Sequence, residues 1–165
     1  MDELPARVRA VCDLNVAEVR EYAGRHEYDG RVQDLSPSGV RDGLARLDRA
    51  RRAGPPQPDA HDEAHLAAFE TGAEVAYRDL ELHRRNPLLH LAELDLAGYD
   101  REYAPAGQRA EARLRQLAAW PPAVDAALAA LDQVSAPVAA ALLGGIRGLA
   151  AGIPPDAPPP VAAAA

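Results

Sequence analysis

Apolar residues in this sequence recur every three or four positions, and no stretch alternates apolar with polar residues as a half-buried strand would. The most regular run lies between Asp59, the expected N-cap, and Asn86-Pro87, its expected end. One face of that run carries Leu66, Phe69, Ala73, Ala76, Leu80 and His83. The pattern predicts an all-α fold, an irregular bundle of about six to eight helices.

Helix boundaries are marked by capping residues, glycines and prolines. Asn15 precedes Glu18 with capping-box spacing, so the chain breaks near Asp13 and a new helix begins. Ser36-Pro37 combines an N-cap with a proline at the first helical position. Further starts are expected at Asp59, Asn86, Pro121-Pro122 and Ser135, and ends at Gly24, Gly54 and Gly98.

Large apolar side chains are scarce. Of the 165 residues 37 are Ala, whereas Leu, Val, Ile and Phe together number 34. Because an Ala methyl buries little apolar surface, we expect marginal stability for the isolated chain. Residues 1–152 are interpreted as a helical N-terminal segment of a larger domain, and residues 153–165, which are rich in Pro and Ala, as a disordered tail.

Charge and hydropathy argue against several classes of partner. The formal net charge is −7, and all 18 basic residues are Arg, interspersed with Asp and Glu. Such a surface has no basic patch for nucleic acid. The charged N-terminus and the lack of 18 consecutive apolar residues argue against export and membrane insertion, so we expect a cytoplasmic protein. The single Cys12 is expected to act as a small hydrophobe.

One motif suggests a metal site. His61-Asp62-Glu63-Ala64-His65 places two imidazoles at i and i+4, about 40° apart on a helix, where they could share an ion. Asp62 occupies the position of the general-base Glu in the zinc-peptidase pattern H-E-x-x-H. A third ligand would have to come from an acidic residue or from His26, His83 or His90. We expect instead two solvated histidines in an acidic first turn, with no metal or other cofactor bound.

No other motif indicates catalysis. His83 continues an apolar stripe and His90 lies between two leucines, so both are expected to be packed histidines. The triplet Asp29-Gly30-Arg31 could bind a ligand, but a polar surface loop is the simpler interpretation. Phosphate-binding glycine loops, nucleophile elbows and paired-Cys metal motifs are absent from the sequence. We therefore predict no catalytic, cofactor-binding or metal-binding residues.

Three stretches together resemble a known family. They are YAGRHEYDGRVQDLSPSGV (22–40), RNPLLHLAELDLAGYD (85–100) and RLRQLAAWPPAVDAALAALDQVSAPVAAALLGGIRGLAAG (113–152). In their order of loops and caps they are similar to the N-terminal helical region of the "domain of unknown function 885" proteins, and the resemblance covers most of residues 10–152. Members of that family are longer than this chain and are similar to zincin-type metallopeptidases, whose H-E-x-x-H helix lies in the C-terminal portion.

The resemblance implies a non-catalytic role. No catalytic or metal-binding residue of the family falls on this sequence, and the stretch from His61 to His65 is not the family's zinc helix. The expected role is to pack against a peptidase-like core and to wall one side of its substrate cleft, as a truncated or partial member. Two alternatives remain: a stand-alone helical interaction module that binds a partner protein through its Leu and Ala faces, and a small metal-binding protein that uses His61 and His65.

Overall fold

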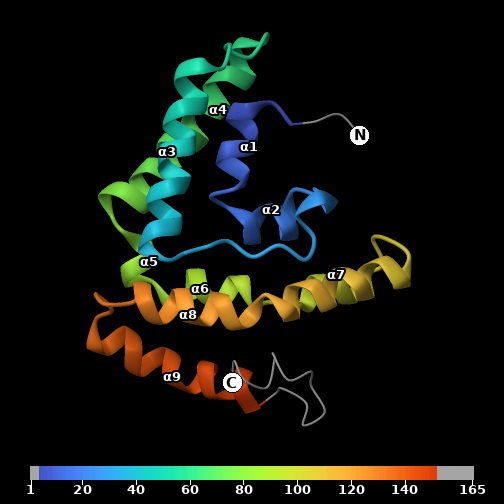
Figure 1. The fold of residues 1–165 in the computed structure, drawn as a ribbon, viewed down its shortest axis with the longest axis vertical. Helices are drawn as coiled ribbons and strands as arrows, with labels where there is room; N and C mark the ends of the chain where they lie inside the picture. Colours follow the sequence, from blue (N-terminus) through green and yellow to red (C-terminus); the bar gives the residue numbers. More distant parts are fainter. Residues whose placement is uncertain (1–3, 152–165) are drawn as a thin grey trace.

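The computed structural model describes residues 4–151, and this part of the chain is helical, with short 3₁₀ and π segments and no strand (Figure 1). The predicted all-α fold is therefore confirmed. The predicted disordered tail, residues 153–165, lies outside the described residues. The α-helices are α1 (Ala6–Cys12), α2 (Val16–Tyr22), α3 (Pro37–Ala53), α4 (Ala60–Glu74), α5 (Leu82–Arg85), α6 (Pro87–Glu93), α7 (Ala106–Ala118), α8 (Trp120–Ala130) and α9 (Ala136–Ala151). The shorter segments are η1 (His26–Tyr28), η2 (Val75–Asp79) and η3 (Ala97–Asp100).

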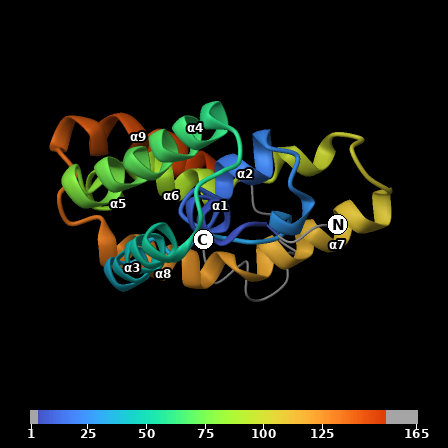
Figure 2. The ribbon, with the colours of Figure 1, turned by 90° about the horizontal axis from the view of Figure 1, so that it is seen from above.

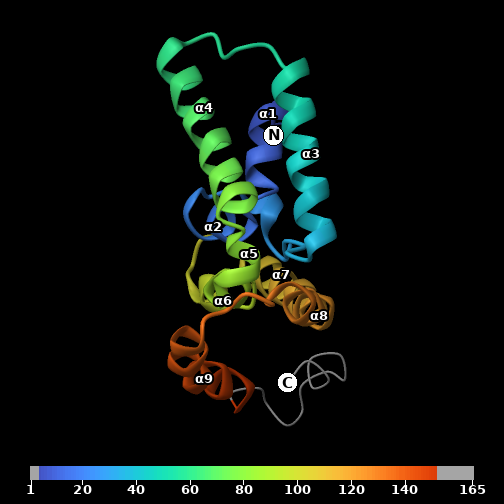
Figure 3. The same ribbon diagram turned by 90° about the vertical axis from the view of Figure 1, so that its left-hand side faces the viewer.

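The helices form two layers with α9 below them. In Figures 1 and 3 the helices α1, α3 and α4 make an upright bundle, and the view of Figure 3 shows α1 between the other two. Helices α6, α7 and α8 cross beneath this bundle, and α9 lies beyond them. The view from above shows α7 extending outward beyond α2 (Figure 2). None of the helices in residues 4–151 combines the length and apolar character needed to cross a bilayer.

The main hydrophobic core fills the upright bundle. It joins α1, α3, α4 and the segments that follow α1 and precede α3, and its buried members include Leu14, Leu35, Leu47, Leu66 and Tyr77. A smaller cluster, formed by Val16, Val19 and Tyr28, lies between α2 and η1. Because few large apolar residues are available, buried polar pairs supply much of the remaining interior.

Three of the predicted helix starts are confirmed by their capping hydrogen bonds. The Ser36 Oγ accepts from the Gly39 backbone N–H at 3.1 Å. The Asp59 Oδ1 accepts from the His61 N–H at 2.7 Å, and the Asn86 Oδ1 from the Leu88 N–H at 3.1 Å. The caps at Ser36 and Asn86 each satisfy one of the four N–H groups that a helix start leaves without an intrahelical partner, and Asp59 satisfies two, those of His61 and Asp62.

The predicted capping box at Asn15 is wrong, although the chain does break between α1 and α2. The Asn15 side chain instead donates from Nδ2 to the Val11 carbonyl at 2.8 Å, so it caps the end of α1. The predicted end at Gly98 is also wrong, because α6 ends at Glu93. Gly98 lies in η3, where an added Cβ would be only 2.4 Å from the Glu21 Oε1. This glycine permits close packing and does not end a helix.

The predicted continuous helix from Asp59 to Asn86 is divided. Helix α4 runs into the π segment η2, and Glu81 then adopts a left-handed backbone with a φ of 47° before α5 begins. This division makes the number of α-helices in the described chain nine, above the expected range. The predicted apolar face is also partly wrong, because Phe69 is 65% exposed and Leu80 50% exposed, whereas Glu70 is fully buried.

Glu70 is buried because Arg7 reaches it from α1. The Arg7 Nε and Nη2 donate to the two Glu70 carboxylate oxygens at 2.8 and 2.9 Å, a bidentate geometry. Arg7 also bonds Glu63, whose pKa it holds below the usual range. A charged pair thus fixes α1 against α4 at a level of the bundle where the apolar pattern predicted Phe69.

Candidate functional site

The His61–His65 motif lies at the surface of α4. The two rings lie close together, with centroids 4.2 Å apart and planes tilted by 44°, and both residues are exposed. Among residues 4–151 no three His, Cys, Asp or Glu side chains are grouped closely enough to hold a metal ion. The carboxylate next to the motif, Glu63, already bonds Arg7. The fold therefore leaves the two imidazoles without a third ligand in the described chain.

His83 and His90 are packed histidines, as predicted. Both are buried, and the His90 Nε2 lies 2.8 Å from the His83 carbonyl oxygen, which it contacts as a donor. Burial lowers the pKa of each imidazole, because the low-dielectric surroundings disfavour the charged form. Their arrangement stabilises the turn from α5 to α6 and does not resemble a metal site.

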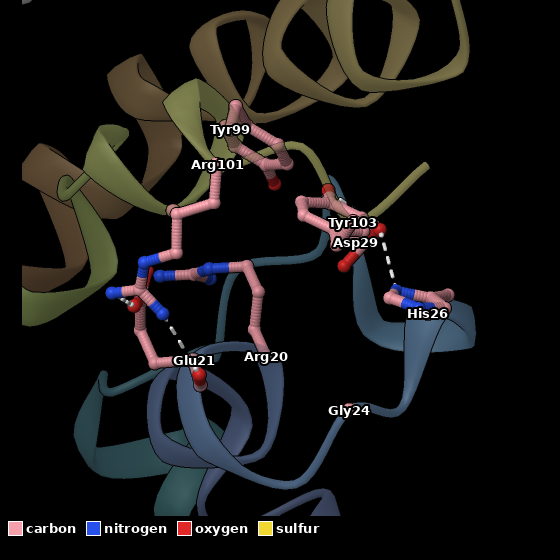
Figure 4. Close-up of a pocket in the computed structure, with 9 residues that line it drawn as sticks. Arg20, Glu21, Gly24, His26, Asp29, Tyr99, Arg101 and Tyr103 are labelled. Carbon is pink, nitrogen blue, oxygen red and sulfur yellow. Dashed lines mark hydrogen bonds and ion pairs between the residues drawn. The ribbon is translucent and has the colours of Figure 1, made fainter. Parts of the chain in front are cut away.

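A small cavity lies where the α2–η1 loop meets η3 and the loop that follows it (Figure 4). Its volume is about 110 Å³, and it is more enclosed than the shallow grooves found elsewhere on the described chain. We call it the Arg20–Asp29 pocket. It is lined by Arg20, Glu21, Gly24, His26, Asp29, Gly98, Tyr99, Arg101 and Tyr103.

One end of the pocket is formed by two guanidinium groups and one carboxylate. The Arg20 side chain is only 3% exposed; its Nη1 and Nη2 donate to the carbonyls of Arg31 and Ala92 at 2.8 and 3.0 Å. The Arg20 Nε is buried and has no partner. Arg101 is more exposed and pairs with Glu21 through a 2.8 Å contact from Nη2 to Oε2.

The other end is formed by an aromatic stack around a carboxylate. The His26 and Tyr103 rings are nearly parallel, with centroids 4.7 Å apart. The Tyr103 hydroxyl donates to the Asp29 Oδ2 at 2.9 Å, and the His26 Nδ1 lies 3.4 Å from the same oxygen. Burial, and then the Asp29 carboxylate, raise the pKa of Tyr103, so this phenol stays neutral and keeps its proton for the hydrogen bond.

A polar network beneath the pocket holds its two halves together. The Tyr99 hydroxyl accepts from the Gly30 N–H at 2.8 Å and donates to the Gln116 Oε1 at 2.7 Å. The Gln116 Nε2 donates in turn to the carbonyls of Glu93 and Asp95. Gln116 is fully buried. Its side chain links α7 directly to the end of α6 and, through Tyr99, to the Gly30 loop.

An unpartnered apolar helix is the second notable feature. Val138, Leu143 and Ile146 of α9 are 39%, 44% and 42% exposed. An added Cβ at Gly144, Gly145 or Gly148 would meet nothing within 4 Å. The well-packed helix pairs of the described chain do not include α9.

The start of this helix is nevertheless fixed to the rest of the protein. The Arg84 Nε and Nη2 donate to the two Asp132 carboxylate oxygens at 2.9 and 2.7 Å. The Arg84 carbonyl also accepts from the Gln133 N–H at 3.1 Å. These bonds connect the loop before α9 to α5, while the apolar side chains of α9 are exposed.

Sequence reasoning named only part of the pocket. It singled out Asp29 as a loop residue and His26 as a possible metal ligand, but it did not identify Arg20, Tyr99 or Tyr103. The loop glycines were the available signal: Gly24 and Gly30 have φ values of 61° and 76°, which only glycine adopts readily. They shape the loop that brings Asp29 opposite Arg20.

Comparison with known proteins adds no assignment to this geometry. No family model, no curated protein and no solved structure matches this chain.

Proposed function

We propose that this chain is the non-catalytic helical portion of a zinc-metallopeptidase-like protein of the "domain of unknown function 885" type, and that α9 packs against its catalytic part. The single observation that carries the proposal is the exposed apolar surface of α9, whose preceding loop is bonded to Arg84 through Asp132. In this role the chain forms one wall of the substrate cleft and supplies no reacting group.

The energetics of α9 support a partner. A helix of 16 residues is marginal in water, because most helix stability in proteins comes from packing an apolar face. The three glycines inside α9 weaken it further, by about 1 kcal/mol each relative to Ala. Glycines with open space above them permit another backbone to approach closely. A catalytic part seated on α9 would bury Val138, Leu143 and Ile146 and stabilise the helix.

The resemblance stretches fit this assignment. Residues 22–40 and 85–100 supply five of the nine residues that line the Arg20–Asp29 pocket, and the described part of residues 113–152 runs from within α7 to the end of α9. The resembling residues are thus concentrated in the lower layer and in α9, on the side of the molecule where the apolar surface lies (Figure 1). The upright bundle supports this layer from above.

The experiment appends a family-like catalytic portion after Ala165 and compares this chimera with the chain alone. We expect zinc-dependent peptide hydrolysis from the chimera and slow amide exchange in α9, against fast exchange in the isolated chain. Leu143→Asp and Ile146→Asp should remove both effects. The matched control is Leu88→Asp, a similarly exposed leucine on α6. An α9 that exchanges equally fast in both proteins contradicts the proposal.

A stand-alone interaction module is the second candidate, and a separate observation favours it. A shallow apolar groove runs along α4, η2 and α5, and Val75 and Leu80 on it are 40% and 50% exposed. A partner helix could lie in this groove. Leu80→Asp separates the two surfaces: it should leave hydrolysis by the chimera intact, whereas a loss comparable to that of Leu143→Asp would contradict the assignment of the catalytic contact to α9 alone.

A further inference from the structure

We propose that this chain forms an antiparallel two-fold dimer through the outward face of α4. This inference is independent of the packing role proposed for α9, which lies at the other end of the molecule (Figure 3). It names a second copy of the chain as the occupant of the apolar groove on α4 and η2. We call the outward face the α4 strip, and its exposed members are Ala64, His65, Ala68, Phe69, Thr71, Gly72 and Val75.

Helix α4 turns its carboxylates inward and apolar side chains outward. Glu70 is fully buried against Arg7 of α1, and Glu74 bonds Arg51 of α3 at 3.1 Å. The α4 strip itself contains neither a carboxylate nor a guanidinium. Apolar side chains also fill the inner face of α4 in the main core. A helix that is apolar on both faces is typical of one that is covered on both, so the α4 strip has the character of an interface.

The α4 strip fits a second copy of itself. Phe69 is 65% exposed, and an added Cβ at Gly72 would meet nothing within 4 Å. Gly72 and Ala76 belong to the lining of the shallow groove, whose volume is about 630 Å³. In an antiparallel pair with its two-fold axis at Gly72, Phe69 of each copy comes to lie over the recess between Gly72 and Ala76 of the other. A two-fold axis makes this contact twice, as in other isologous interfaces.

The ends of the α4 strip also complement each other. His65 lies seven residues before Gly72 and Asp79 lies seven residues after it, and both are exposed. Antiparallel pairing brings each His65 to the level of the partner's Asp79, where an imidazole N–H can donate to the carboxylate. A parallel pairing would instead place the two Asp79 carboxylates level with each other, which is unfavourable. This polarity favours a second copy in the antiparallel direction.

The size of the surface sets the strength of the dimer. At 1.5 Å per residue α4 and η2 run for about 30 Å, and a helix is about 10 Å wide, so each copy offers about 300 Å². A standard stable interface buries about 800 Å² per partner. We therefore expect a reversible dimer with a Kd above about 10 µM.

The first test is sedimentation equilibrium of the full chain between about 10 µM and 2 mM. We expect a monomer at the low end and a dimer at the high end. Phe69→Asp should weaken dimerisation at least about tenfold, because it places a charge in the apolar contact. Leu128→Asp, at a 79% exposed position on α8, is the control and should change nothing. A chain that stays monomeric, or a dimer that Phe69→Asp leaves intact, would overturn the proposal.

Two further variants distinguish the α4 strip from α9 and fix the direction of pairing. Leu143→Asp should leave the dimer unchanged, and a loss in this variant would assign self-association to α9 instead. With Cys12 replaced by Ser, Gly72→Cys places a thiol at the two-fold axis, so mild oxidation should link two copies. Ala64→Cys thiols would be about 24 Å apart, whereas a disulfide needs Cα atoms within about 7 Å. Equal cross-linking at both positions, or none at Gly72→Cys, contradicts the antiparallel dimer.

Discussion

Replacing Arg7 with Met should destabilise the protein more than any exposed substitution of similar size. Met preserves much of the length and apolar stem of Arg but removes the guanidinium that bonds Glu70 and Glu63. Glu70 is then left fully buried, with Arg51 as its nearest remaining cation at 3.7 Å. That contact is too long for a good hydrogen bond, so it replaces only part of the lost interaction.

The magnitude follows from the burial of both partners. Breaking a buried ion pair by removing one partner costs about 3–5 kcal/mol, because an uncompensated charge remains in a low-dielectric site. The whole stability of a domain is about 5–15 kcal/mol, so the Arg7→Met chain should be close to unfolding. In a chain of this length each kcal/mol lowers Tm by about 2–4 °C.

Urea unfolding measured by the fluorescence of Trp120, the only tryptophan and a buried one, provides the assay. The double variant Arg7→Met/Glu70→Leu should recover most of the loss, because well-packed apolar residues replace a buried pair at little cost. The control Arg41→Met, at an exposed position on α3, should stay within about 0.5 kcal/mol of the parent. A cost below about 1 kcal/mol for Arg7→Met, or additive effects in the double variant, would refute the reasoning.

The remaining predictions concern backbone, pH and catalysis. Gly30→Ala should lower the free energy of unfolding by about 1–3 kcal/mol, because the φ of Gly30 is 76° and an added Cβ would lie 2.9 Å from the Ala112 carbonyl oxygen. Gly72→Ala, in the open interior of α4, should raise the free energy of unfolding by about 0.5–1 kcal/mol. Chemical denaturation measures both changes. His83 and His90 have pKa values lowered by burial, so the folded state binds fewer protons than the unfolded state and stability should fall as pH drops below about 6.5. His90→Gln, which can still donate to the His83 carbonyl, should reduce that loss between about pH 6.5 and pH 5 in urea titrations. The chain alone should hydrolyse no peptide in a mixed library with added zinc, because His61 and His65 are at most two of the three protein ligands that a catalytic zinc needs. Mass spectrometry of the products measures this. Cleavage that is abolished by a chelator and by Asp62→Ala would contradict the prediction.

Local signals in the sequence were sufficient for the fold class and for most helix starts. Ser36, Asp59 and Asn86 cap the helices that they were expected to cap, because an N-cap bond forms between residues two or three positions apart and needs no tertiary partner. Gly54 and the pair Pro121-Pro122 mark boundaries for the same local reason. The burial of His83 and His90 also followed from their apolar neighbours in the sequence.

Tertiary structure alone decided that Glu70 and Gln116 are interior. Glu70 and Gln116 read as solvent-facing residues in a helical pattern, and Phe69 reads as core. The partners of the two buried residues lie far away in the chain: Arg7 is 63 positions from Glu70, and Tyr99 is 17 positions from Gln116. A local pattern cannot show whether such a partner exists, and without it burial of either group is prohibitive.

The sequence by itself determined an all-helical chain, poor in large apolar side chains, with its helix starts marked by caps. Only the folded chain decided that Arg20 and Asp29 line one pocket and that α9 exposes its apolar side chains. The physical reason is the range of the interactions. Hydrogen bonds within one helical turn are encoded by neighbouring residues, whereas a pocket and an unpartnered helix face depend on how distant segments pack.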